Sequence, residues 1–199
     1  MVKKLGLVPV SILKLRRGAL SKRMHIFQHE RPRRAGVRQH DDARQIDERR
    51  AQGLIGGRME TMKGTSRLEP STMPAELVAF FVRYYAKEGD TYLDPFMGQG
   101  IRMQVAHHLG LHYYGRDASH EFFAFTDGVR RKIDNGTTHI HITRGDSRHP
   151  DNVPDGVGDF SFHSPPYWNI EHYGDEPEQL GLGTYDQYLE GMRDIFRAW

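Results

Sequence analysis

The chain of 199 residues contains no cysteine. This absence excludes disulfide bonds, thiolate zinc sites and any reaction that proceeds through a cysteine nucleophile, and it agrees with a reducing cytoplasm. Long apolar runs are lacking as well, because no stretch approaches the ~18 residues that a membrane-spanning helix needs. Pro9 interrupts the apolar stretch near the N-terminus, and no small-residue cleavage pattern follows it. We therefore expect no signal peptide, no membrane partner and a cytoplasmic location.

Hydrophobic residues make up a modest 37% of the chain. A chain of this length still buries a substantial core, so the composition fits one α/β domain. The twelve histidines show no spacing typical of metal ligands. We therefore predict no metal site.

The formal net charge of +2 conceals an uneven distribution. Residues 1–60 hold 15 Lys and Arg against 6 Asp and Glu, which leaves 13 against 20 in the remainder. A basic segment of this kind suits contact with nucleic-acid phosphates, whose neutralisation releases counterions. The same pattern, interleaved with acidic residues, is equally typical of a solvated helix or a free arm. We predict a basic N-terminal extension over residues 1–70 and a catalytic domain over residues 71–199.

Strand and helix patterns alternate through the second part of the chain. Ser71 or Thr72 can cap a first helix that has Pro74 in its first turn. The apolar periodicity predicts strands over 91–94, 113–117, 139–143 and 159–163, and further helices over 101–109, 121–133 and 185–198. Such alternation predicts a parallel sheet, and ligands bind at the carboxyl ends of its strands.

The candidate site residues all follow predicted strands. Glycines at 98 and 100 allow the backbone to approach a ligand closely. Asp117 stands about 20 residues beyond this loop, where an acid can accept both hydroxyls of a ribose; its alternative role is to cap the next helix together with Ser119. Asp146 could accept from an adenine amino group, or it could form a turn with its neighbours.

Two motifs carry a family resemblance. The first is Asp94-Pro95-Phe96-Met97-Gly98-Gln99-Gly100, and the second, about seventy residues later, is Ser164-Pro165-Pro166-Tyr167 followed by Trp168. Each alone occurs by chance, whereas the ordered pair with a strand before each is much rarer. Over residues 71–199 the chain resembles the S-adenosylmethionine-dependent DNA amino-methyltransferases, including those encoded by phages.

The resemblance implies a Rossmann-like methyltransferase fold, DNA as the partner and S-adenosylmethionine as the cofactor. It implies catalytic roles for Ser164, Pro165, Pro166 and Tyr167. The cofactor residues that it implies are Thr72, Pro74, Asp94, Pro95, Phe96, Gly98, Gly100, Asp117 and Asp146. It also associates the chain with DNA methylation in a bacterial or phage-infected cell, as in restriction-modification systems.

The chemistry of this family suits the residues present. An exocyclic amino group is a poor nucleophile, so a site must draw its hydrogens towards acceptors and align the nitrogen with the methyl donor. Ser164 and the Pro165 carbonyl can be those acceptors, and a base flipped out of the duplex can stack on Tyr167. Methylation at carbon-5 of cytosine, which in the families that carry it out passes through a cysteine adduct, is excluded. We place N4 of cytosine slightly ahead of N6 of adenine as the target.

Members of the resembled family continue beyond the helix at 185–198 into further strands and a target-recognition region. We therefore expect about four core strands in this chain and exposed apolar surface beside the fourth. Three explanations stay open: a truncated gene product, one part of a split enzyme, or a domain that a second chain or subunit completes. Whether the chain is active alone stays open as well. Two other functions stay open. One is RNA methylation with the same pocket, and the other is nucleic-acid binding without catalysis.

Overall fold

The computed structural model describes residues 7–17, 20–29, 59–62 and 73–199. The chain divides into two compact units, Met1–Arg38 and Gln39–Trp199. The predicted boundary after residue 70 stays a prediction, and ordered contacts in the second unit begin before it. The amide of Met62 donates to Gln99 Oε1 over 2.8 Å, and Met62 is buried.

The first unit contains an antiparallel hairpin of β1 (Leu7–Arg17) and β2 (Leu20–His29). Its register shifts between Pro9 and Ser11. Proline has no amide to donate to a ladder, so an irregularity at this point is expected. The apolar pattern over Leu7–Leu13 predicts a short strand, which is the first part of β1, whereas no pattern predicts β2. The arginines of residues 31–50, on which the prediction of phosphate contact rests, lie outside the described residues.

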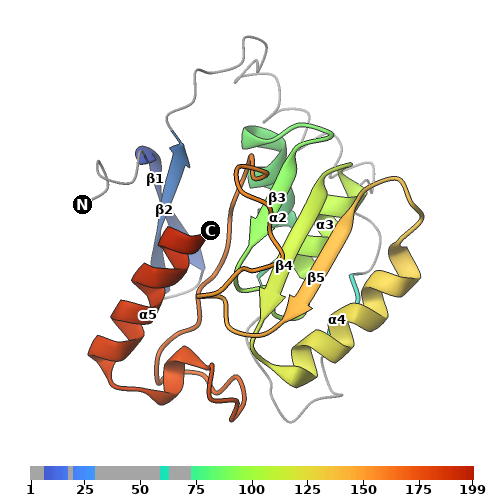
Figure 1. Cartoon of the computed structure of the whole chain (residues 1–199). Coiled ribbons are helices and arrows are strands. Elements are labelled where there is room, and N and C mark those ends of the chain that lie inside the picture. The colour runs from blue at the N-terminus through green and yellow to red at the C-terminus, as the bar shows by residue number, and fades with distance from the viewer. Residues whose placement is uncertain (1–6, 18–19, 30–58, 63–72) are drawn as a thin grey trace. The chain divides into compact units, whose positions relative to one another are not determined.

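The second unit is built around a parallel sheet. Its strands stand in the order β3-β4-β5, and helices connect them along the chain, as Figure 1 shows. The strands are β3 (Thr91–Asp94), β4 (His112–Asp117) and β5 (Ile140–Arg144). The helices are α2 (Ala75–Tyr85), α3 (Ile101–His108), α4 (His120–Ile133) and α5 (Tyr185–Ala198), with a short 3-10 helix η2 (Leu180–Leu182) before the last. The predicted α/β class with a parallel sheet is confirmed.

The fourth predicted strand is present only as a single parallel bridge, between Phe160 and Tyr92 of β3. Beyond this bridge, side-chain hydroxyls rather than backbone amides bind the carbonyls that would continue the ladder. The Ser161 hydroxyl donates to the carbonyl of Leu93 over 2.9 Å, at the position where the next backbone amide would bind. The Tyr92 hydroxyl donates to the carbonyl of Phe162. The expectation of four full strands is corrected to three strands and one bridged segment.

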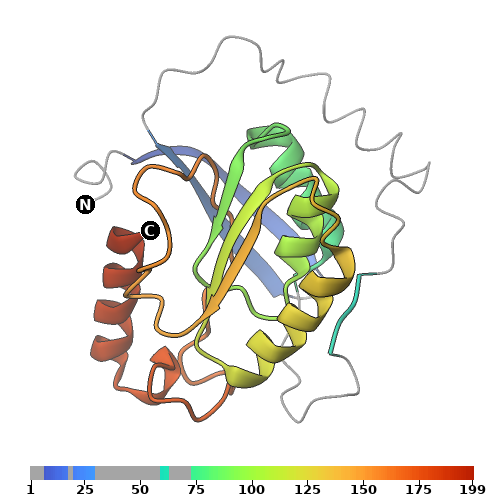
Figure 2. The same ribbon diagram turned by 45° about the vertical axis from the view of Figure 1, so that its right-hand side comes forward.

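The core lies between the sheet and the helices α2, α3 and α4, which Figure 2 shows on one side of the sheet. Tyr92 and Tyr113 are fully buried, and their ring centroids are 5.6 Å apart. Phe162 packs on Phe81 of α2 with centroids 4.4 Å apart and is buried too. The predicted exposed apolar surface therefore does not include Phe162. The large apolar side chains that are exposed in the described part of the chain are Ile170, Leu182, Tyr185, Leu189 and Phe196.

Helix α2 begins differently from the prediction. Its N-cap is Pro74, with no side-chain cap, whereas Ser71 and Thr72 lie outside the described residues. Helix α5 has the bounds that its apolar periodicity predicted, and Thr184 and Gln187 form a capping box at its start. No helix in the described ranges has both the length and the apolar character needed to cross a membrane.

Candidate functional site

The glycine loop between β3 and α3 is held by the end of β4. The amide of Met97 donates to the carbonyl of Arg116 over 3.0 Å, and the amide of Gly98 donates to Asp117 Oδ2 over 2.7 Å. Gly98 has φ of 53°, and a Cβ at this position would meet only the Phe96 carbonyl, 4.0 Å away. The backbone at Gly98 is thus bare towards open space, as close approach of a ligand requires.

Gly100 serves packing rather than ligand approach. It is the N-cap of α3 with φ of 71°, and a Cβ here would lie 2.6 Å from Thr126 Cγ2. The Thr126 hydroxyl donates to the carbonyl of Gly98 over 2.9 Å, so α4 closes against the loop. Only glycine permits both the backbone angle and this contact.

Asp94, the first residue of the same loop, holds it through buried hydrogen bonds. Its side chain is fully buried, Oδ2 accepts from Arg102 Nε over 2.6 Å and from the Tyr113 hydroxyl over 2.7 Å, and Oδ1 accepts from the Phe96 amide over 3.1 Å. Burial and the nearby Asp94 carboxylate raise the pKa of Tyr113, which therefore stays protonated as a donor. A buried charge that is paired and hydrogen-bonded in this way fixes the path of the chain.

Asp117 closes β4 at the same rim. Besides the Gly98 amide, its carboxylate accepts the amide of Ser119 through Oδ1 over 2.9 Å. Burial raises the pKa of Asp117 to about 6, although both backbone hydrogen bonds act in the opposite direction. The N-cap of α4, the alternative role considered for Asp117, is formed by Ser119, whose side chain accepts from the amide of Phe122. Asp117 is consequently left facing the cavity described below.

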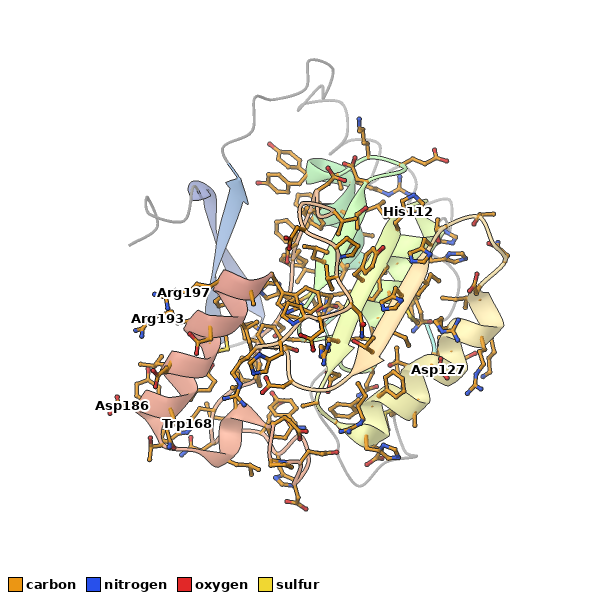
Figure 3. The ribbon with its side chains drawn as sticks, viewed as in Figure 1. His112, Asp127, Trp168, Asp186, Arg193 and Arg197 are labelled. Atoms are coloured by element: carbon orange, nitrogen blue, oxygen red, sulfur yellow. The ribbon has the colours of Figure 1, made fainter. Side chains whose placement is uncertain are left out.

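The Ser164–Tyr167 motif comes shortly after Phe160, the residue that bridges to β3, and so it leaves the sheet beside that strand. Ser164 Oγ and the Tyr167 hydroxyl lie 3.3 Å apart and share a hydrogen bond. Trp168, labelled in Figure 3, turns away towards the start of α5, where its indole donates to the Gly183 carbonyl over 3.0 Å and its ring lies 5.2 Å from that of Tyr185. The two side-chain hydroxyls of the motif are thus hydrogen-bonded to each other, whereas Trp168 contacts the loop that precedes α5 and the first residue of that helix.

His163, directly before the motif, is part of an aromatic stack. Its ring lies 5.3 Å from that of Phe96 and 5.4 Å from that of Phe196 in α5. Burial lowers the pKa of His163 to about 4. The imidazole is therefore neutral at physiological pH, and it links the glycine loop to α5 by packing.

One cavity brings the two motifs together. Its non-protein space is about 880 Å³ with the open mouth included. Of the predicted residues, the lining includes Pro95, Phe96, Gly98, Asp117, Ser164, Pro165, Pro166 and Tyr167.

The other predicted residues lie elsewhere. Asp94 and Gly100 support the loop from behind, and Pro74 caps α2. Thr72 lies outside the described residues. Asp146 pairs with Arg148, whose Nε lies 2.8 Å from Oδ2, and accepts that residue's amide through Oδ1 over 2.9 Å, which is the turn that the sequence left open. Hydrogen bonds from Arg148 lower the pKa of Asp146 against the opposing effect of burial.

Several lining residues were not predicted. Ser147 follows Asp146, lines the cavity and donates from its hydroxyl to the Pro95 carbonyl over 2.6 Å. Tyr173 and Gln179 come from the loop before η2, and Ile195 comes from α5. No local pattern marks these residues, because they reach the cavity only through the tertiary fold. Within the described residues, no group of three or more His, Asp or Glu is placed to hold a metal ion.

Comparison with known proteins supports the resemblance. Residues 39–126 match a family described as DNA methylase, of the N6 and N4 type. The matched segment contains the glycine loop and Asp117 and ends before the Ser164–Tyr167 motif. This match confirms the resemblance to the amino-methyltransferases.

Twelve chains among the solved structures match, including an rRNA methylase from Streptococcus thermophilus that is 12% identical with a TM-score of 0.38. The alignment covers 63% of this chain and 64% of that one, so this chain spans less than two thirds of the neighbour's length. A likeness at this TM-score establishes neither the fold nor the substrate of this chain. No curated protein matches the chain significantly.

Proposed function

We propose that this chain transfers a methyl group from S-adenosylmethionine to an exocyclic amino group of a DNA base. The observation that carries the proposal is the shared cavity, in which the glycine loop and Asp117 face the Ser164–Tyr167 motif. The order of the two motifs and the family match over residues 39–126 support it. N4 of cytosine stands slightly ahead of N6 of adenine as the acceptor.

The cofactor half of the cavity has features that fit S-adenosylmethionine. The bare backbone at Gly98 allows close approach, and Asp117 offers carboxylate oxygens to the ribose hydroxyls. Phe96 and Phe122 supply apolar surface in the same lining, which suits an adenine ring. When bound, S-adenosylmethionine supplies an electrophilic methyl group on a positively charged sulfur.

The target half of the cavity offers acceptors for an amino group. Ser164 Oγ and the Pro165 carbonyl would accept its two hydrogens, so that the nitrogen lone pair becomes available for attack. A proline pair has no amides to compete for these acceptors. The Tyr167 ring gives a flipped base a stacking surface, worth about 1–3 kcal/mol.

Binding and product analysis test the proposal together. Calorimetry should detect S-adenosylmethionine binding to the full chain, and Gly98→Trp should abolish it by filling the space beside the loop. Gly136→Trp is the matched control, since Gly136 also has positive φ and open surroundings but lies in the turn between α4 and β5. Absence of binding to the unmodified chain would refute the proposal.

Mass spectrometry of nucleosides then identifies the acceptor. We expect methylated cytosine or adenine in treated duplex DNA, whereas transfer confined to tRNA or rRNA would replace DNA by RNA as the substrate. Ser164→Ala should lower the rate about 10- to 100-fold, since a hydrogen bond to a group that develops charge contributes about 1.5–3 kcal/mol. Its affinity for S-adenosylmethionine should be unchanged.

A further inference from the structure

The peptide bond between Pro166 and Tyr167 is held at both ends by tyrosine hydroxyls from outside the motif. The Pro166 carbonyl accepts from the Tyr188 hydroxyl over 2.9 Å. The Tyr167 amide donates to the Tyr173 hydroxyl oxygen over 3.3 Å. Both groups belong to one planar unit, so two hydrogen bonds in opposite directions fix the orientation of that plane.

The two hydroxyls have set directions. The Tyr173 hydroxyl donates to Glu171 Oε2 over 2.9 Å, which leaves its oxygen lone pair free to accept the Tyr167 amide. Burial raises the pKa of Tyr173, and the Glu171 carboxylate raises it further, so the donor stays protonated. Burial also raises the pKa of Tyr188. Glu171 therefore orients Tyr173, and Tyr173 orients the peptide.

The two tyrosines come from different elements. Tyr188 lies in the second turn of α5, a helix fixed to the cavity by Ile195 and to the Ser147 carbonyl by the Trp199 indole over 2.8 Å. Tyr173 lies in the loop before η2 and lines the cavity itself. The same loop reaches the cofactor side, where Glu176 Oε1 accepts the amide of His120, the first residue of α4, over 2.7 Å.

We propose that Tyr173 and Tyr188 are positioning residues, which clamp the Pro166–Tyr167 peptide and thereby aim the Pro165 carbonyl and the Tyr167 ring at the target base. The proline rings restrict φ at positions 165 and 166. Pro166 also confines Pro165 to extended values of ψ, as a proline does to the residue before it. The rotation about ψ of Pro166 is not restricted by either ring, and the two hydrogen bonds to the following peptide limit it. This inference rests on the proposed methyl transfer for its functional part, whereas the clamp itself can be tested without activity.

Fluorescence tests the clamp. The chain has two tryptophans, and in a Trp199→Phe background Trp168, which follows Tyr167 directly, is the sole reporter. Tyr173→Phe and Tyr188→Phe should each raise acrylamide quenching of Trp168 about twofold or more, because a loop that loses such a bond samples more conformations. Tyr185→Phe is the matched control. Tyr185 lies in the same helix, is 51% exposed and keeps its ring against Trp168 after the change. Quenching equal to the control in both variants would overturn the clamp.

Kinetics test its consequence. In the otherwise unmodified chain, Tyr173→Phe and Tyr188→Phe should each lower kcat about three- to tenfold, the range that one lost neutral hydrogen bond corresponds to. The dissociation constant of S-adenosylmethionine should stay within about twofold, and Tyr185→Phe should leave both quantities unchanged. A parallel loss of kcat and cofactor affinity would indicate general loosening and overturn the positioning role, as would unchanged kcat with raised quenching. A chain that shows the quenching change but transfers no methyl group to any nucleic acid would refute the proposed function and leave the clamp standing.

Discussion

The ionisation of Asp117 should make cofactor binding depend on pH in a defined direction. Burial raises the pKa of Asp117 to about 6, so the carboxylate is charged at pH 7 and mostly neutral at pH 5. Ribose hydroxyls donate hydrogen bonds, and an ionised carboxylate accepts them more strongly than a neutral carboxyl group does. Affinity for S-adenosylmethionine should therefore be close to its full value at pH 7 and fall as the pH drops through 6.

The size of the effect follows from the pKa. If only the ionised form binds, the apparent dissociation constant should be about 2-fold higher at pH 6 and about 11-fold higher at pH 5 than at high pH. His163 titrates near pH 4, below this range. Calorimetric titrations between pH 5 and 7 measure the profile, and Asp117→Asn is the control because its side chain does not titrate. The variant should bind more weakly at pH 7 with a flat profile.

The free energy of unfolding should depend on pH in the opposite direction to cofactor affinity. Because the folded pKa of about 6 lies above the ordinary value of 3.8, folded Asp117 binds more protons than unfolded Asp117 between these values. Its contribution to the free energy of unfolding therefore increases as the pH falls from about 6 to 4. Urea denaturation of the unmodified chain and of Asp117→Asn isolates this contribution as their difference.

The binding experiment has its own refuting outcomes. If the two proteins show the same pH profile of S-adenosylmethionine binding, or if binding tightens on acidification, Asp117 does not accept the ribose hydroxyls as an ionised carboxylate.

Two further predictions concern the support of the loop. Gly100→Ala should lower the free energy of unfolding by about 1–3 kcal/mol, because the new Cβ would lie 2.6 Å from Thr126 Cγ2 at a positive φ. Gly128→Ala, in α4 with open space around the new Cβ, should instead stabilise by up to ~1 kcal/mol, and an equal loss in both variants would contradict the packing argument. Arg102→Met should cost about 3–5 kcal/mol in urea denaturation, since it leaves the buried Asp94 without its charged partner. Retention of full stability by that variant would show that the pair does not hold the loop.

The parts of the site that could be predicted are those that lie within one stretch of chain. The glycine loop follows β3 and Asp117 ends β4, so strand periodicity and loop composition were enough to place them at one rim of the sheet. The segment before Ser164 lies beside β3, although its predicted strand is reduced to a single bridge. The Ser161 hydroxyl occupies the next ladder position, which no strand propensity expresses.

Contacts between distant segments limited the prediction elsewhere. In α2 the helical spacing of Leu77, Phe80, Phe81 and Tyr84 predicts one buried face. Of these four only Phe81 is buried, and the other buried residues of the helix are Val78, Ala79 and Val82. Phe80 and Tyr84 stack on each other with centroids 6.2 Å apart along the helix surface. Large side chains thus dominated the sequence pattern, whereas the buried face combines Phe81 with the smaller Val78, Ala79 and Val82.

Strand order explains why loops about seventy residues apart share a cavity. The chain runs outward from β3 to β4 and β5 and then returns, so that Phe160 bridges to the free edge of β3. The chain reverses direction across the sheet between β3 and this segment, which is the place where α/β sheets bind ligands. A donor on the loop after β3 and an acceptor on the loop after Phe160 therefore become neighbours without any intervening element. Direct transfer between two bound molecules requires this adjacency, and placement of the acceptor loop after β5 would separate it from the donor loop by the width of two strands.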